Sequence, residues 1–260
     1  MKLPIYQVDA FASAVFGGNP AAIVPLESWI GDRAMQSIAE ENNLAETAFF
    51  VAEGDDFRLR WFTPVCEVDL CGHATLATGW LLLNRLQPWR DKVTFHTLSG
   101  PLTVAREGDL LAMDLPARPA APAVAPSELI AAMGAKPREV LKARDFLLVY
   151  ERAEDVRRLK PDMSALAKVD TFAVCATALG DGGHDFISRF FAPRQGITED
   201  PVTGSAHCTL VPYWAARLGK KRLNAFQASA RGGELVCVLD GERIRLIGSC
   251  AMYLEGTIHL

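Results

Sequence analysis

The hydrophobic pattern of the chain is most pronounced in two long apolar segments. Residues 74–83 read ATLATGWLLL and are nearly all apolar. Residues 204–218 read GSAHCTLVPYWAARL and are apolar on nearly every face of a helix. A helix without a polar face must be buried all round. The pattern therefore predicts two central helices, each wrapped by other elements.

These two helices belong to a longer internal repeat. Residues 72–86 align without gaps on residues 204–218, and RWFTP at 60–64 corresponds to RFFAP at 189–193. Self-similarity of this kind indicates a duplicated structural unit. Each helix is followed by alternating apolar and polar residues with glycine-bearing turns, at 93–115 and 224–246, which predict a hairpin.

The repeat predicts the fold class and the domain organisation. We expect an α+β protein with two similar domains, each a curled β-barrel around its central apolar helix. Residues 116–126 (PARPAAPAVAP) are rich in proline and alanine and are typical of a linker. The predicted domains are therefore 1–116 and 117–260, with a C-terminal strand near 251–260 able to return to the first domain.

Composition and charge exclude several classes of function. The 260 residues are 50% hydrophobic and 22% charged, with a net charge of −4, which argues against a nucleic-acid surface. No apolar run reaches the roughly 18 residues of a membrane span, and the first residues lack the pattern of a signal peptide. We expect a cytoplasmic protein that contacts neither nucleic acid nor membrane.

The six cysteines and the glycine-rich segments give no cofactor motif. The cysteines form no CxxC pair, and Cys66, Cys71 and His73 lie close in sequence without an evident fourth ligand. We therefore expect reduced thiols and no metal. GGNP at 17–20 and GDGGHD at 180–185 lack the spacing of a phosphate-binding loop, so no nucleotide cofactor is expected.

Polar residues stand at the start of both predicted helices. Residues 71–73 (Cys-Gly-His) correspond to residues 203–205 (Thr-Gly-Ser). The unpaired N–H groups at a helix start favour negative charge. Two such starts facing each other would bind a carboxylate or an enolate-like intermediate. The alternative is structural: a buried cysteine acting as a small hydrophobe, a packing glycine and a capping histidine.

Four motifs carry a family resemblance. VFGGNPAAIV, NLAETAFF, CGHAT and ITEDPVTGSAH occur in this order, and together they resemble the phenazine-biosynthesis PhzF family of isomerase-like proteins across essentially the whole chain. The resemblance implies a diaminopimelate epimerase-like fold, an active site between the domains and a homodimer. It places the catalytic carboxylate at Glu46 and further cleft residues at His73, Asp200 and Ser205.

The three expected catalytic residues also have a physical case. Glu46 borders the apolar run 47–51, where partial desolvation suits a base that takes a proton from carbon. His73 is expected to be neutral, because a helix start lowers an imidazole pKa, and either to donate a hydrogen bond to a developing oxyanion or to shuttle a proton. Asp200 is expected to share the proton relay or to orient His73. The structural alternatives are a strand residue paired with an arginine, a capping histidine and an Asp-Pro turn.

The remaining candidates are expected to contact substrate. Gly72 and Gly204 offer backbone N–H groups, Ser205 a hydroxyl, Asn19 an amide and Cys71 a thiol. Asn19 has a turn-stabilising alternative, and Cys71 stays outside the catalytic set. The related epimerases use two cysteines as paired acid and base, whereas here Cys71 corresponds to Thr203. A threonine hydroxyl is too weak an acid for that exchange.

Three hypotheses of function follow. The favoured one is a cofactor-independent isomerase that moves a proton between carbons of a small carboxylate-bearing substrate, with Glu46 as general acid and base. The second is an epimerase, racemase or dehydratase of a small amino or imino acid that uses Cys71. The third is a small-molecule-binding protein without catalysis.

Overall fold

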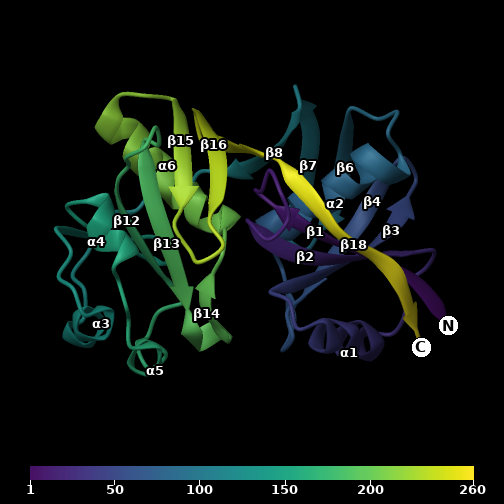
Figure 1. Cartoon of the computed structure of the whole chain (residues 1–260), viewed down its shortest axis with the longest axis horizontal. Helices are drawn as coiled ribbons and strands as arrows, with labels where there is room; N and C mark the ends of the chain where they lie inside the picture. The colour runs from purple at the N-terminus through teal and green to yellow at the C-terminus, as the bar shows by residue number, and fades with distance from the viewer. The chain divides into compact units, whose positions relative to one another are not determined.

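The computed structural model describes residues 1–260, and its internal contacts divide the chain into two compact units. Unit 1 comprises Met1–Asp114 and Ile247–Leu260, and unit 2 comprises Leu115–Leu246. Both units mix helices with a majority of strands (Figure 1). None of the helices combines the length and the apolar character that a membrane crossing requires.

Unit 1 is built mainly of antiparallel strands. Its elements are β1 (Lys2–Ala10), β2 (Asn19–Leu26), α1 (Asp32–Asn42), β3 (Glu46–Glu53), β4 (Asp56–Phe62), β5 (Glu67–Val68), α2 (Gly72–Leu81), the π-helical turn η1 (Leu82–Leu86), β6 (Lys92–Thr97), β7 (Gly100–Glu107), β8 (Leu110–Pro116) and β18 (Cys250–His259). Hydrogen bonds connect the strands in the order β18, β1, β2, β3, β4, β6, β7, β8. Two pairs, β2–β3 and β4–β6, are parallel, and β5 pairs with the end of β4.

Unit 2 repeats this arrangement. Its elements are β9 (Ala121–Pro122), α3 (Ser127–Met133), β10 (Glu139–Lys142), β11 (Phe146–Val149), α4 (Ala153–Arg157), α5 (Met163–Leu166), β12 (Val174–Leu179), β13 (Phe186–Ala192), the 3-10 turn η2 (Pro193–Gln195), β14 (Ile197–Asp200), α6 (Gly204–Leu218), β15 (Arg222–Gln227), β16 (Gly233–Asp240) and β17 (Arg243–Gly248). The order β10, β11, β12, β13, β15, β16 has parallel pairs at β11–β12 and β13–β15, the same places as in unit 1.

Equivalent side chains accompany the equivalent strands. Arg60 of β4 bonds Glu67 at 2.7 Å, and Arg189 of β13 bonds Glu199 at 2.7 Å. In each case the arginine lies in the RWFTP or RFFAP segment, and the glutamate lies on the short strand that leads to the central helix. The repeat seen in the sequence thus appears both in the strand pairing and in a partly buried ion pair at the equivalent place in each unit.

The two apolar segments form helices of the same extent. Residues 72–86 are helical as α2 and η1, and α6 spans Gly204–Leu218. Helix α2 contacts β1, β2 and β3 and also β7, from near both ends of the strand order. The approach to β7 is close, because a Cβ at Gly79 would lie 2.6 Å from Cγ1 of Val104. Closure of each sheet into a barrel stays a prediction.

The structure adds strands that the sequence pattern did not separate. Where one hairpin was expected after each helix, three strands follow: β6, β7 and β8 in unit 1, and β15, β16 and β17 in unit 2. The extra reversals occur at Gly108 and Gly241, whose φ values of 62° and 59° suit tight turns. The expected linker at 116–126 also contains β9, which pairs with β10.

The C-terminal strand lies in unit 1. Strand β18 runs antiparallel to β1 from Lys2↔His259 to Ala10↔Cys250, and Figure 1 shows the last residues beside the first. The contact boundary between the units falls after Asp114, two residues before the boundary expected at 116, and Ile247–Leu260 rejoin unit 1.

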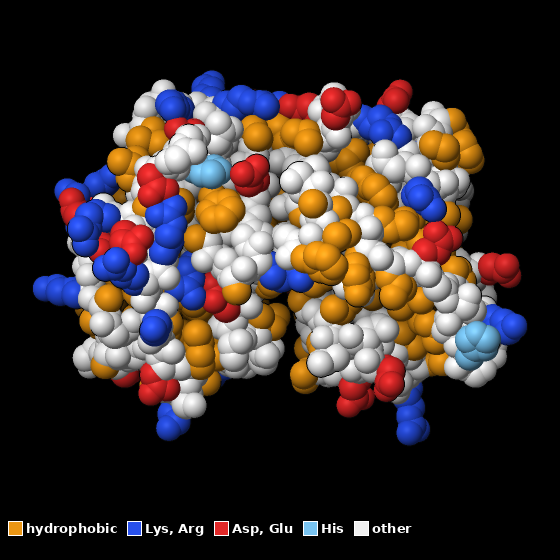
Figure 2. Space-filling view, viewed as in Figure 1, with side chains coloured by type: hydrophobic (Ala, Val, Ile, Leu, Met, Phe, Trp, Pro, Cys, Tyr) orange, Lys and Arg blue, Asp and Glu red, His pale blue; other side chains and the backbone are white.

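Surface charge is mixed in sign. On the face shown in Figure 2, lysine and arginine side chains are interspersed with aspartates and glutamates. Charged side chains of the protein form ion pairs, such as Arg58 with Glu53 at 3.1 Å and Arg217 with Glu139 at 2.7 Å. This mixture is typical of a solvated protein surface rather than of a field that attracts a polyanion.

Candidate functional site

Glu46 is held at the point where the chain enters the sheet of unit 1. Helix α1 ends at Asn43, whose left-handed backbone (φ 49°) turns the chain back toward β3. Glu46 is the first residue of β3 and lies beside Ala21 of β2. Residues 47–50, which follow Glu46, are buried, so β3 runs into the core directly after this residue. Only 12% of the Glu46 side chain is exposed.

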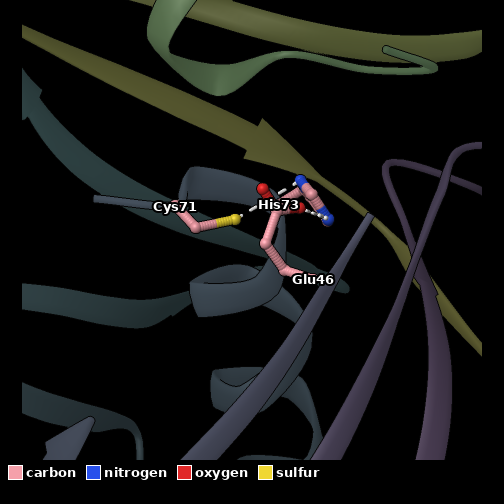
Figure 3. Close-up of side chains that lie close together, drawn as sticks. All are labelled: Glu46, Cys71 and His73. Carbon is pink, nitrogen blue, oxygen red and sulfur yellow. Dashed lines mark hydrogen bonds and ion pairs between the residues drawn. The ribbon is translucent and has the colours of Figure 1, made fainter. Parts of the chain in front are cut away.

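His73 brings an imidazole to this carboxylate. It is the second residue of α2, and 4% of its side chain is exposed. Its Nε2 lies 3.2 Å from Oε2 of Glu46. Figure 3 shows the two side chains pointing toward each other from β3 and the start of α2.

Asn19 holds the other side of the imidazole ring. It is fully buried at the start of β2, and its Nδ2 lies 3.0 Å from Nδ1 of His73. Gly18 makes this placement possible: its φ is +60°, and a Cβ there would lie 2.1 Å from the carbonyl oxygen of Ala10. Asn19 was expected to contact substrate or to stabilise a turn. The structure gives it another role, since its amide orients the imidazole of His73.

Cys71 lies on the same side of the ring as Asn19. Its Sγ is 3.6 Å from Nδ1 of His73, and the residue is buried. One donor atom each from Glu46, Cys71 and His73 lies within 4.8 Å of the other two, so these three could hold a metal ion. Cys66, the other nearby thiol in the sequence, is exposed and lies outside this group.

Burial keeps His73 neutral. Loss of hydration lowers its pKa to about 3, so the imidazole is uncharged at physiological pH. The sequence-based expectation of a lowered pKa is met, but the cause is burial rather than the helix start. With the amide of Asn19 donating to Nδ1, the ring proton resides on Nε2, the nitrogen that lies 3.2 Å from Oε2 of Glu46.

A second polar group surrounds the start of α6 in unit 2. The hydroxyl of Thr203 donates to Oδ2 of Asp200 at 2.5 Å. Gln227 of β15 is fully buried beneath this turn. Its Oε1 accepts from the backbone N–H of Thr203 at 2.9 Å, and its Nε2 donates to the carbonyl of Asp200 at 2.7 Å. The turn that carries Asp200 is thus fixed from below.

Ser205 has an arginine neighbour. Arg144 donates to Oγ of Ser205 at 3.2 Å while its Nε contacts Oδ1 of Asp145 at 3.1 Å. Its guanidinium also lies 4.1 Å from the ring centroid of Phe172. An arginine held on two sides is a pre-oriented cation, and it supplies positive charge beside the α6 start.

Neither central helix has a side-chain cap at its N-terminus. Cys71 precedes α2 and Thr203 precedes α6, and neither side chain accepts a bond from the first turn. Instead, Thr75 donates to the carbonyl of Cys71 at 2.5 Å, and at the equivalent place His207 Nδ1 lies 2.8 Å from the carbonyl of Thr203. The first N–H groups of each helix, including those of Gly72 and Gly204, therefore receive no hydrogen bond from the side chain of the residue before the helix.

The structure brings together four of the sequence-predicted residues in unit 1: Asn19, Glu46, Cys71 and His73. The predicted residues of unit 2 gather at the start of α6. Gln227 and Arg144 were not predicted as site residues.

The sequence does contain an indication for Gln227, because it is a polar residue at an inward position of the alternating strand β15. It contains no indication for Arg144, which is one of many arginines and lies near a turn.

Sequence comparison identifies the relatives of this chain. A model of the PhzC-PhzF family, described as phenazine biosynthesis-like protein, matches residues 8–256. An uncharacterized isomerase of Pseudomonas aeruginosa is 52% identical, with 100% of both chains covered. The human phenazine biosynthesis-like domain-containing protein is 40% identical, with 99% of both covered.

Solved structures give the same result for the fold. A PhzF-family protein of Enterococcus faecalis has a TM-score of 0.96 and 44% identity, with 100% of both chains covered. A hydroxyproline epimerase of Agrobacterium vitis has a TM-score of 0.67 at 10% identity, covering 99% of this chain and 92% of its own, which shows a shared fold alone. The chain therefore belongs to the PhzC-PhzF family of isomerase-like proteins, as the resemblance of its motifs indicated.

Proposed function

We propose that the protein is a cofactor-independent isomerase in which Glu46 moves a proton between two carbons of a small carboxylate-bearing substrate. The observation that carries the proposal is the buried pair of Glu46 and His73, whose Oε2 and Nε2 lie 3.2 Å apart. A carboxylate beside a neutral imidazole in a desolvated site suits proton transfer to and from carbon.

His73 supports the carboxylate in two ways. Its Nε2 proton stabilises the charged form of Glu46 between turnovers. When Glu46 has taken a proton, the same N–H is available to an oxyanion that develops on the substrate. Asn19 keeps the ring in the orientation that both tasks require, since it holds Nδ1 at 3.0 Å.

The two helix starts would bind the negative groups of the substrate. Gly72 at the start of α2, together with Gly204 and Ser205 at the start of α6, offers uncapped N–H groups and a hydroxyl. In this proposal Asp200 assists the return of the proton to the second carbon. A shared cleft between the units, homodimerisation and these catalytic roles stay predictions from the sequence.

The family name suggests where to look for the substrate. Small aromatic and alicyclic carboxylic acids screened by thermal shift would identify binders, which stabilise the folded state by mass action. Each binder is then incubated in heavy water, and proton NMR follows the uptake of deuterium at carbon. The wild-type protein should catalyse this exchange.

The decisive variant is Glu46→Gln, which keeps the shape of the side chain and removes the base. We expect the exchange rate to fall by about 10²–10⁴-fold, the usual contribution of a general base. Glu53→Gln is the matched control, because Glu53 lies at the exposed end of the same strand. Exchange at the parental rate in Glu46→Gln would show that Glu46 is not the base.

A second candidate function rests on the thiol beside His73. The 3.6 Å contact between Cys71 and His73 resembles the environment of an activated cysteine, as an epimerase, racemase or dehydratase would need. The hydroxyl of its counterpart Thr203 donates a hydrogen bond to Asp200. A hydroxyl there does not supply the second thiol that a two-cysteine mechanism needs. Under this alternative Cys71→Ala abolishes exchange and Glu46→Gln does not; a protein that binds the acids without any exchange is a binding protein.

A further inference from the structure

We propose that Glu46, Cys71 and His73 together bind one thiophilic divalent cation, such as Zn²⁺, and that the bound cation withholds the Glu46 carboxylate from substrate. The site shares residues with the proposed proton transfer, but cation binding is a separate property that is measured without substrate. The structure motivates this proposal by the kind, spacing and burial of the three donors.

The donor spacing is close to what a tetrahedral ion needs. Bonds of about 2.0–2.3 Å to nitrogen, oxygen and sulfur place neighbouring donors about 3.3–3.6 Å apart. Oε2 of Glu46 and Nε2 of His73 lie 3.2 Å apart, so these two already span a cation. Cys71 supplies the third donor, because one donor atom from each of the three residues lies within 4.8 Å of the other two. Its Sγ lies 3.6 Å from Nδ1 of His73 and must move toward Nε2 for the three side chains to share one ion.

The chemistry of the donors favours zinc-like ions over magnesium or calcium. A carboxylate oxygen, an imidazole nitrogen and a thiolate sulfur are all ligands that Zn²⁺ accepts, whereas hard cations prefer oxygen alone. When the cation binds, Cys71 releases its thiol proton to solvent, and the resulting thiolate and the Glu46 carboxylate carry two negative charges that cancel the charge of the ion. All three residues are buried, so the attraction is little screened by water.

Ligation through Nε2 requires a change of tautomer at His73. The ring proton moves from Nε2 to Nδ1, and Nε2 can then take up a cation. A ligating histidine generally has its second nitrogen held by another side chain. Asn19 is 3.0 Å from Nδ1 and can accept from it once its amide is turned to present the oxygen.

Three protein donors leave one position open on a tetrahedral ion, as in sites that exchange a ligand rather than in closed structural sites. The cation would therefore be removable by chelators. While bound, it occupies the carboxylate that the proposed reaction uses, so a thiophilic cation would act as a reversible inhibitor.

Cobalt(II) tests the proposal directly, because it takes zinc-like geometry and reports its ligands by absorption. The reduced, chelator-treated protein is titrated with CoCl₂. We expect saturation at one ion per chain, with a thiolate-to-cobalt charge-transfer band and the intense visible bands of a tetrahedral ion. Addition of ZnCl₂ should remove both signals.

The variants assign the donors. Cys71→Ser should abolish the charge-transfer band, and Glu46→Gln and His73→Gln should each weaken Co²⁺ binding at least 10-fold. Cys66→Ser is the matched control, since Cys66 is exposed and close in sequence but outside the donor group, and it should leave the spectrum unchanged. Circular dichroism establishes that each variant is folded.

Two outcomes would overturn the proposal: no charge-transfer band in the wild type, or a band that survives Cys71→Ser and disappears in Cys66→Ser. Glu46→Gln provides a test that does not depend on altering the buried thiol: if ZnCl₂ raises its thermal midpoint as much as that of the wild type, the carboxylate is not a ligand. None of these results bears on whether Glu46 exchanges protons with a carbon acid, which the heavy-water experiment measures.

Discussion

At the scale of single residues, a buried glutamine determines the shape of the α6 start. Gln227 accepts from the N–H of Thr203 and donates to both the carbonyl of Asp200 and the hydroxyl of Thr203. No exposed atom of the side chain remains. Every polar atom of this side chain is therefore used, and each bond holds the turn that presents Asp200.

Gln227→Leu should accordingly be costly. It keeps the approximate volume but leaves the Thr203 N–H and the Asp200 carbonyl buried without their partner, and each such loss costs about 1–3 kcal/mol. We expect the free energy of unfolding in urea to fall by about 2–4 kcal/mol. Gln195→Leu is the control, because Gln195 is exposed. Equal small effects in both variants would contradict the bridging role.

His207 should make stability depend on pH. Burial lowers its pKa to about 4, below the usual value of 6.5, because the charged form cannot be hydrated there. The folded state therefore binds fewer protons than the unfolded state between these values. The stability contribution is complete above pH 6.5 and is lost as the pH falls toward 4.

The test uses the residue at the equivalent place in the repeat. The Thr75 hydroxyl donates to the carbonyl of Cys71, four residues earlier, and His207 makes the equivalent bond to the carbonyl of Thr203. His207→Thr can therefore keep a bond to the Thr203 carbonyl and remove the titrating group. Urea unfolding at pH 7 and pH 4.5 should show a smaller loss of stability in His207→Thr than in the parent. His259→Thr changes an exposed histidine and should follow the parent. Parallel losses in parent and His207→Thr would exclude this histidine as the cause.

The sequence predicted much of the site at this scale, but not its supports. Glu46 and His73 stood out because charged or imidazole groups adjoined long apolar runs. Arg144 and Gln227 act through contacts with residues 61 and 24 positions away in the chain, at Ser205 and Thr203. Such contacts depend on strand pairing, which local patterns do not contain.

At the scale of elements, the close approach of α2 and β7 depends on a missing side chain. A Cβ at Gly79 would lie 2.6–2.9 Å from three atoms of Val104, closer than carbon atoms pack. Glycine usually weakens a helix by about 0.5–1 kcal/mol relative to alanine. Here its small size allows the helix to contact the sheet.

Gly79→Ala should therefore destabilise the protein despite the gain in helix propensity. We expect a loss of about 1–3 kcal/mol, the usual cost of overpacking a core. In the double variant with Val104→Ala, the added methyl has room, so the loss should be smaller than the sum of the two single losses. Gly31→Ala is the control, because nothing lies within 4 Å of a Cβ there. Additive losses would show that the two positions do not clash.

Element identity was predictable where the pattern was long and less so where it was short. The helices at 72–86 and 204–218 were expected over their full length, because an all-apolar run of this size has few alternatives. The alternating residues after each helix were read as one hairpin, whereas each makes three strands. The alternation of apolar and polar residues continues unchanged through a tight turn, so it does not reveal how many strands the segment forms.

At the scale of the whole molecule, strand β1 depends on both ends of the chain. It pairs with β2 on one side and with β18 on the other. Most of β18 is exposed, so its main contribution is the backbone pairing and the cover that it gives to buried β1 residues such as Leu3 and Val8.

Deletion of residues 250–260 should destabilise unit 1 strongly. It leaves β1 as an unpaired edge, which promotes association of chains as well as unfolding. We expect a fall of about 10 °C or more in the thermal midpoint, with aggregation visible by light scattering. Deletion of Leu260 alone should have little effect, because Leu260 is exposed, lies beyond β18 and forms its backbone hydrogen bonds with Met1. An unchanged midpoint after the longer deletion would contradict this account.

The pairing of β1 with β18 also bears on synthesis. A ribosome delivers residues 115–246 before it delivers the strand that borders β1. Chains with several domains usually mature from the amino terminus onward. Here the first half to emerge must wait for residues 250–260, so residues 115–246 can reach their native state first, and loss of residues 250–260 would damage the portion translated earliest.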